Sequence, residues 1–137
     1  MPVFGTRERQ KVDVSLIRTY TVPMKSFSGT VVRGSQRAAT LGYPTINLVV
    51  DNMNIDGIFA AIVTIDGRER MAAAFADPLR GLLEAHILDV TEDFYGREAK
   101  IVLHKKIRRN RHFETDDALK EAIASDVEAT RAYFSHT

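Results

Sequence analysis

The sequence contains no cysteine, and none of its apolar runs is long. Without cysteine the chain can form neither disulfides nor thiolate metal sites, and it has no cysteine nucleophile. No apolar stretch approaches the roughly 20 residues that a membrane-spanning helix requires. The polar N-terminal residues also lack the apolar segment of a signal peptide. We therefore expect a cytoplasmic protein with no membrane partner.

An excess of charge of either sign is also missing. The 19 lysines and arginines nearly balance the 18 acidic residues, which gives a formal net charge of +1. No overall field therefore favours nucleic acid as the main partner, and electrostatics must act locally. At 137 residues, of which 45% are hydrophobic and 27% charged, the chain has the size and composition of one soluble domain.

Hydrophobic periodicity is unclear at the N-terminus and clear in the rest of the sequence, which divides the chain into an arm and a domain. Residues 1–26 are polar and lack clear periodicity, so we interpret them as a linker or a packed arm, followed by a domain over residues 27–137. An Asp66-Gly67 pair between two β-like runs indicates a hairpin. Strands are predicted over residues 27–33, 58–65, 68–75, 82–88 and 99–107.

Two of these strands carry polar residues on one face. In the run 82–88, Leu83, Ala85 and Ile87 share one face, whereas Glu84 and His86 share the other. Glu84 is therefore not required to lie in the core.

The same alternation applies to the last predicted strand, which follows a turn at residues 95–97. It places one set of side chains on the apolar side and another on the wet side. These sets are Ile101, Leu103 and Ile107 against Lys100, His104 and Lys106.

The C-terminal segment has the signals of an amphipathic helix. Thr115 is a candidate N-cap, and the acidic pair at 116–117 complements the helix dipole. Leu119, Ile123 and Val127 recur at helical spacing and should pack against the sheet. Short strands followed by one such helix favour a small, mostly β, antiparallel barrel capped by a helix.

The most informative motif is LGYPTIN at residues 41–47. Gly42 permits a tight turn, and Pro44 fixes φ and removes a backbone donor. Thr45 and Asn47 then supply two neutral oxygen ligands on one face of an extended segment. A hydroxyl and an amide oxygen side by side suit a hard cation such as Mg²⁺, which also keeps oxygens from water and nucleotide phosphates.

These residues resemble the riboflavin kinase (flavokinase) family, whose module occurs alone or behind an FAD synthetase domain. Its signature reads roughly G-x-V-x-x-G followed by L-G-[FY]-P-T-[AI]-N, which matches residues 29–34 and 41–47. The order and spacing of the pieces make the match specific, because any one of them recurs by chance. The resemblance covers residues 27 to 134 and continues through residues 57–60, 84–88, 93–96 and 107–108, Phe113 and Asp126.

The resemblance implies a six-stranded antiparallel barrel with a C-terminal helix. It implies transfer of the γ-phosphate of ATP to the ribityl 5′-hydroxyl of riboflavin, giving FMN and ADP. Glu84 matches the family's catalytic glutamate and is the candidate general base. Thr45 and Asn47 would hold Mg²⁺, or another divalent cation, against the phosphates of ATP.

The remaining candidate binding residues also rest on the resemblance. The segment 34–40 corresponds to a phosphate-binding loop that begins at Gly34, with Arg37 as its cation. Arg108 and Phe113 are candidates for flavin contacts, since the family binds flavin near the end of the barrel and before the last helix.

The chain departs from the family pattern in two places. Relatives usually carry glycine where Ala38 stands, and a Cβ there opposes a positive φ. The segment between Phe75 and Glu84 is also shorter than in relatives. These changes leave open a second interpretation, a flavin- or nucleotide-binding module of the same fold without turnover.

A third interpretation is a nucleic-acid-binding barrel that uses the basic cluster at residues 105–111. That cluster lacks interleaved aromatic residues, and runs of this kind are usually solvated. The interpretation predicts strongly salt-dependent binding to polynucleotide.

Overall fold

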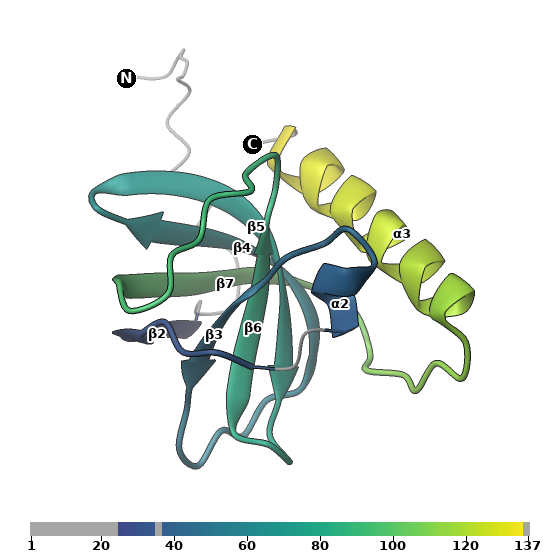
Figure 1. Ribbon diagram of the computed structural model, residues 1–137, viewed down its shortest axis with the longest axis horizontal. Coiled ribbons are helices and arrows are strands. Elements are labelled where there is room, and N and C mark those ends of the chain that lie inside the picture. The colour runs from purple at the N-terminus through teal and green to yellow at the C-terminus, as the bar shows by residue number, and fades with distance from the viewer. Residues whose placement is uncertain (1–24, 35–36, 136–137) are drawn as a thin grey trace, which may run out of the picture.

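The computed structural model describes residues 25–34 and 37–135, which form a twisted sheet with one long helix against it (Figure 1). The elements in chain order are β2 (Lys25–Thr30), α2 (Arg37–Thr40), β3 (Ile46–Val49), β4 (Gly57–Ile65), β5 (Arg68–Asp77), β6 (Leu82–Ile87), β7 (Glu98–Arg108) and α3 (Asp116–Ser135).

The strands form one sheet in the order β2-β7-β4-β5-β6-β3, and every pairing is antiparallel. The two edge strands, β2 and β3, approach one another, and Val32 just after β2 forms an isolated bridge with Asn47 of β3. The Val32 amide donates to the Asn47 carbonyl at 2.8 Å. The sheet is thus a nearly closed six-stranded barrel, which confirms the predicted fold class.

The core lies inside the barrel and follows the predicted alternation. Leu83, Ala85 and Ile87 of β6 point inward and are buried. On β5 the inward positions are occupied by alanines, which leave room for larger residues on neighbouring strands. The other inward residues are Val31, Ile46, Leu48, Ala61, Val63, Ile65, Ala72, Ala74, Ala76, Phe94, Ala99, Ile101 and Leu103.

Helix α3 lies against the outer side of β4 and β5 (Figure 1). Its start is as predicted, because the Ala118 amide donates to Thr115 Oγ1 at 3.1 Å. Its predicted apolar stripe is only half-buried, whereas Asp126 and Thr130 are the buried residues of the helix. The helix therefore carries a polar group into its contact with the barrel, which the apolar periodicity did not indicate. Within residues 25–34 and 37–135, no helix is long and apolar enough to cross a membrane.

The pairing of strand β7 with β4 is irregular. Its register with β4 shifts twice, so that His104 and Ile107 have no paired position opposite them. After the first shift Lys106 pairs with Phe59, a residue that packs against the core. Burial agrees with the predicted faces at Ile101 and Leu103, which are buried, and at Lys100 and Lys106, which are exposed. The two register shifts interrupt strict alternation beyond Leu103, because each leaves an extra residue on β7.

Element boundaries differ from the predicted ones at the start of the domain. Strand β2 takes in Lys25 and Ser26, the last two residues of the expected arm, and ends at Thr30 rather than Arg33. The rest of the arm, residues 1–24, lies outside the described residues. The short strand β3 was expected only as an extended segment, because four residues are too few to show a period.

Candidate functional site

The two halves of the candidate site meet on adjacent strands. Asn47 of β3 and Glu84 of β6 are directly opposite partners in the register. Opposite residues of an antiparallel pair share one face, so both side chains lie on the outer face of the barrel. The inward neighbours Leu48 and Leu83 occupy the other face, in the core. The pairing therefore brings the proposed metal ligand and the proposed base into contact range, with Cβ atoms about 5 Å apart.

Asn47 is buried although it faces outward, with 3% of its surface exposed. The chain at Gly34 passes directly over its side-chain amide, and a Cβ on residue 34 would collide with Asn47 Oδ1 and Cγ. Among the described residues, Asn47 Oδ1 is the buried side-chain oxygen that has no hydrogen-bond partner. A buried acceptor without a protein partner is costly, which makes Asn47 Oδ1 a candidate ligand atom.

The neighbouring residues fit a hard cation at this position. Thr45 lies two residues before Asn47, so the segment offers a hydroxyl oxygen beside the amide oxygen. In the described part of the chain, no group of three or more His, Cys, Asp or Glu side chains could hold a metal ion. A cation here would have few protein ligands and would take the others from water or phosphate, which is the usual behaviour of Mg²⁺.

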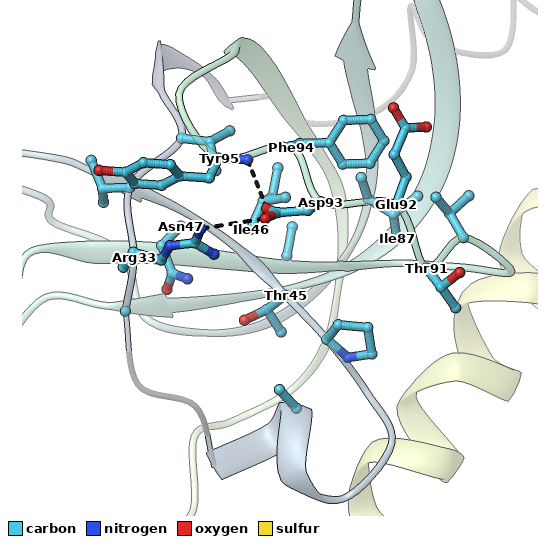
Figure 2. Close-up of a pocket in the computed structure, with 17 residues that line it drawn as sticks. Arg33, Thr45, Ile46, Asn47, Ile87, Thr91, Glu92, Asp93, Phe94 and Tyr95 are labelled. Atoms are coloured by element: carbon cyan, nitrogen blue, oxygen red, sulfur yellow. Dashed lines mark hydrogen bonds and ion pairs between the residues drawn. The ribbon is translucent and has the colours of Figure 1, made fainter.

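A cavity of about 170 Å³ opens beside Asn47 and Thr45 (Figure 2). Its other side is formed by the loop that leads into β7, where Asp93 Oδ1 accepts a hydrogen bond from the Tyr95 amide at 3.0 Å. Arg33 Nη2 lies 3.3 Å from Asp93 Oδ2, and its guanidinium stacks on the Tyr95 ring at 4.2 Å. The Tyr95 amide, with Arg33, lowers the pKa of Asp93.

The sequence analysis did not assign a role to this group. Arg33 and Tyr95 are far apart in the sequence, and neither lies in a local pattern that distinguishes it from other exposed residues. The motif that includes Asp93 and Tyr95 was visible only as part of the family resemblance.

A second, larger cavity of about 290 Å³ lies between the barrel, α3 and the segment that precedes α3. Thr45 lines both cavities, so they meet at this residue. Glu84 lines the larger cavity, and its side chain is 10% exposed. The other lining residues include the apolar groups Ile58, Ala73, Ala74, Phe75, Phe113, Leu119 and Ile123.

Glu84 is held by an arginine that the sequence analysis did not single out. Arg80 Nη2 donates to Glu84 Oε2 at 2.6 Å, and Arg80 Nε donates to Asp77 Oδ2 at 2.5 Å. The hydrogen bond to Asp77, and then the one to Glu84, raises the pKa of Arg80. Arg80 therefore remains charged beside the proposed base.

The candidate binding residues divide between the two cavities. Gly34 lies at the smaller cavity with Asn47, whereas Arg37, Arg108 and Phe113 line the larger one with Glu84. Arg37, which was expected as the cation of the phosphate loop, therefore lines the larger cavity and not the one beside Asn47.

Instead, Arg37 Nη2 donates to the Phe113 carbonyl at 3.2 Å and lies 3.3 Å from Asp116 Oδ1. Arg108 forms two hydrogen bonds of 2.8 Å with Asp126 of α3. The Phe113 ring lies beneath the guanidinium groups of Arg108 and Arg111.

His86, to which no role was assigned, connects the two strands of the site. Its Nδ1 donates to the Pro44 carbonyl at 2.7 Å, since a carbonyl oxygen can only accept. Its ring also meets Tyr43 edge to face, with centroids 5.2 Å apart. His86 therefore fixes the segment that leads to Thr45 against strand β6.

Ala38 is one of the two departures noted in the sequence, and its backbone is helical. It lies in α2 and is not among the described residues with positive φ. Its carbonyl accepts hydrogen bonds from the amides of Leu41 and Tyr43, at 3.0 and 2.9 Å. The concern that a Cβ opposes a positive φ does not apply to this helical conformation.

Comparison with known proteins supports the resemblance seen in the motifs. The sequence profile of the family described as Riboflavin kinase matches residues 23–134. The Bifunctional riboflavin kinase/FMN adenylyltransferase of Escherichia coli (strain K12) is 34% identical over 121 residues, which cover 82% of this chain and 39% of that protein. The Trifunctional protein RibF/MnmA of Mycoplasmoides gallisepticum is 33% identical over 115 residues, or 77% of this chain and 18% of that protein.

These two relatives are longer proteins, and the chain spans less than half of either. A solved structure of similar size also matches, that of riboflavin kinase from Trypanosoma brucei. It has a TM-score of 0.60 and 28% sequence identity, and the match covers 84% of this chain and 82% of that one. The match over most of the domain, in both sequence and fold, shows that the chain belongs to the riboflavin kinase family.

Proposed function

We propose that the protein is an ATP-dependent riboflavin kinase, which transfers the γ-phosphate of ATP to the ribityl 5′-hydroxyl of riboflavin and releases FMN and ADP. The observation that carries the proposal is the pairing of Asn47 with Glu84 on adjacent strands. It sets a candidate phosphate-side ligand next to a candidate base, at the point where two cavities meet at Thr45.

The larger cavity suits the flavin. Its apolar wall, with Phe75 and Phe113, matches an aromatic ring system, and Glu84 is one of the polar groups that also line it. Riboflavin bound there with its ribityl chain towards Thr45 would present the terminal hydroxyl to Glu84. The smaller cavity, beside Gly34 and Asn47, is then the site for the phosphates of ATP.

Glu84 is the proposed general base. An alcohol is a weak nucleophile at neutral pH, and a positioned base contributes about 10²–10⁴-fold to such a reaction. Glu84 accepts the hydroxyl proton as the new bond to the γ-phosphorus forms and the bond to the β-phosphate oxygen breaks. Positioning of the two substrates by the cavity walls supplies most of the remaining catalysis.

Thr45 and Asn47 are the proposed ligands for Mg²⁺ or another divalent cation. When bound, the cation would offset the negative charge of the phosphates. The contribution of the chain is to hold the Asn47 side chain in one orientation, which the close passage of Gly34 enforces.

An endpoint assay tests the proposal. Purified protein is incubated with riboflavin, ATP and Mg²⁺, and FMN is separated from riboflavin by chromatography. The wild type is expected to form FMN, and Glu84→Gln is expected to lose about 10²–10⁴-fold in kcat. Glu69→Gln is the matched control, because Glu69 is an exposed residue of β5 and should leave the rate unchanged.

Two results would contradict the proposal. Binding of riboflavin and ADP without FMN formation by the wild type would favour a binding module. Salt-dependent affinity for polynucleotide, together with no flavin binding, would favour the nucleic-acid interpretation. The structure gives that interpretation little support, because Lys106 and Arg108 of the basic cluster are ion-paired with Asp56 and Asp126.

A further inference from the structure

The turn between β5 and β6 brings Arg80 onto the proposed base. Residues 78–81 form this turn. The turn is closed by hydrogen bonds from the Gly81 amide to the Pro78 carbonyl, at 3.3 Å, and from the Val50 amide to the Gly81 carbonyl, at 2.8 Å. Arg80 therefore extends from a fixed backbone.

The guanidinium of Arg80 donates hydrogen bonds to two carboxylates. Nε is bonded to Asp77 and Nη2 to Glu84, and the Asp77 side chain is itself only 13% exposed. Asp77 thus orients the arginine, and the arginine in turn holds one oxygen of Glu84. Among the described residues no partner is found for the other oxygen, Glu84 Oε1.

This arrangement solves two physical problems for a base on a cavity wall. A carboxylate that is 10% exposed needs a compensating charge, since uncompensated burial is costly. A glutamate side chain also has several rotamers, and a displacement of about 1 Å at a reacting group can cost about 10²-fold in rate. The hydrogen bond from Arg80 to Glu84 Oε2 both compensates the charge and restricts the rotamer, and it leaves Oε1 available to the cavity.

We propose that Arg80 is a positioning residue, which holds Glu84 Oε2 so that Oε1 faces the substrate hydroxyl. This inference rests on the proposed function, because it assigns Arg80 a role only if Glu84 is the base. The turn before β6 supplies this arginine.

Steady-state kinetics separate positioning from substrate binding. Arg80→Met keeps the aliphatic stem but removes the charge, and it should lower kcat about 10–100-fold with both KM values within about threefold of wild type. Arg80→Lys restores the charge and should recover part of kcat. Arg68→Met, at an exposed position of β5, is the matched control and should behave as wild type. An unchanged kcat, or a loss confined to KM, would overturn the proposal.

A second measurement does not depend on activity. The thermal unfolding midpoints of Arg80→Met, Glu84→Gln and the double variant form a double-mutant cycle. If Arg80 holds Glu84, the loss in Tm of the double variant is smaller than the sum of the single losses. Additive losses would overturn the proposal even in an active enzyme. If the losses are coupled but the wild type forms no FMN, the contact between Arg80 and Glu84 is confirmed and the proposed function is refuted.

Discussion

Asn47 and Glu84 lie directly opposite each other on β3 and β6, and both are buried on the outer face of the barrel. The core lies on the other face of the same strands, so this polar pair takes no part in core packing. Gly34 covers Asn47, and Arg80 contacts Glu84. The neighbouring chain thus restricts both side chains without filling the cavities beside them.

Gly34 should be essential for nucleotide binding. In Gly34→Ala the new Cβ collides with Asn47 and displaces its Oδ1, so affinity for ADP in the presence of Mg²⁺ should fall at least about tenfold, which corresponds to about 1.4 kcal/mol. Titration calorimetry with ADP and Mg²⁺ measures this loss. Gly29→Ala is the control, because its Cβ would meet only Leu48 Cδ2, at an ordinary 3.9 Å. Equal affinities for the two variants would show that Asn47 is not a phosphate-side ligand.

The pair Arg108 and Asp126 should stabilise the contact between β7 and α3. Their side chains are 24% and 6% exposed, and Asp126→Leu would leave the Arg108 charge without its partner, at a cost of about 3–5 kcal/mol in the free energy of unfolding. Urea denaturation measures this cost. The double variant Arg108→Met/Asp126→Leu, which removes both charges, should recover much of it. A single variant as stable as wild type would rule out a structural role for the pair.

Asp89 should contribute to stability in a pH-dependent way. It accepts two hydrogen bonds from Arg131 of α3, at 2.9 and 2.7 Å, and this contact lowers the pKa of the Asp89 carboxyl. A lowered folded-state pKa gives stability that is fully present above the unfolded value, near 4, and is lost as pH falls through the folded value.

The Tm difference between wild type and Asp89→Asn should therefore be present at pH 7 and should shrink as the pH falls below about 4. Asparagine suits the site because residue 89 has a φ of 62°, which Asn tolerates. Asp51→Asn, in an exposed turn, serves as the control. A Tm difference that persists unchanged at low pH would show that the carboxylate charge is not the cause.

Replacement of Ala38 by glycine, the residue that the family resemblance led us to expect there, should not improve the protein. Ala38 is helical, so Ala38→Gly gains no needed backbone freedom and should cost about 0.5–1 kcal/mol or less in unfolding free energy. The KM for ATP should stay within about twofold of wild type. A fall in KM of fivefold or more would instead mean that α2 must adopt a different conformation when nucleotide binds.

Local patterns in the sequence were sufficient for most of the fold. The Asp66-Gly67 hairpin, the alternation around Glu84 and the cap at Thr115 all depend on neighbours within a few residues, and the structure has each of them. Strand β5 is a partial exception, because the alanines in the run 71–76 favour strand weakly and are held there by pairing on both sides.

The sequence by itself therefore determined the barrel class, the motif at 41–47 and, through the family resemblance, the candidates Thr45, Asn47 and Glu84. Only the tertiary structure decided that Asn47 faces Glu84, that Arg80 holds the same carboxylate, and that two bulges shift β7. Strand register and side-chain contacts form between residues far apart along the chain, and local periodicity carries no information about which strand is the neighbour.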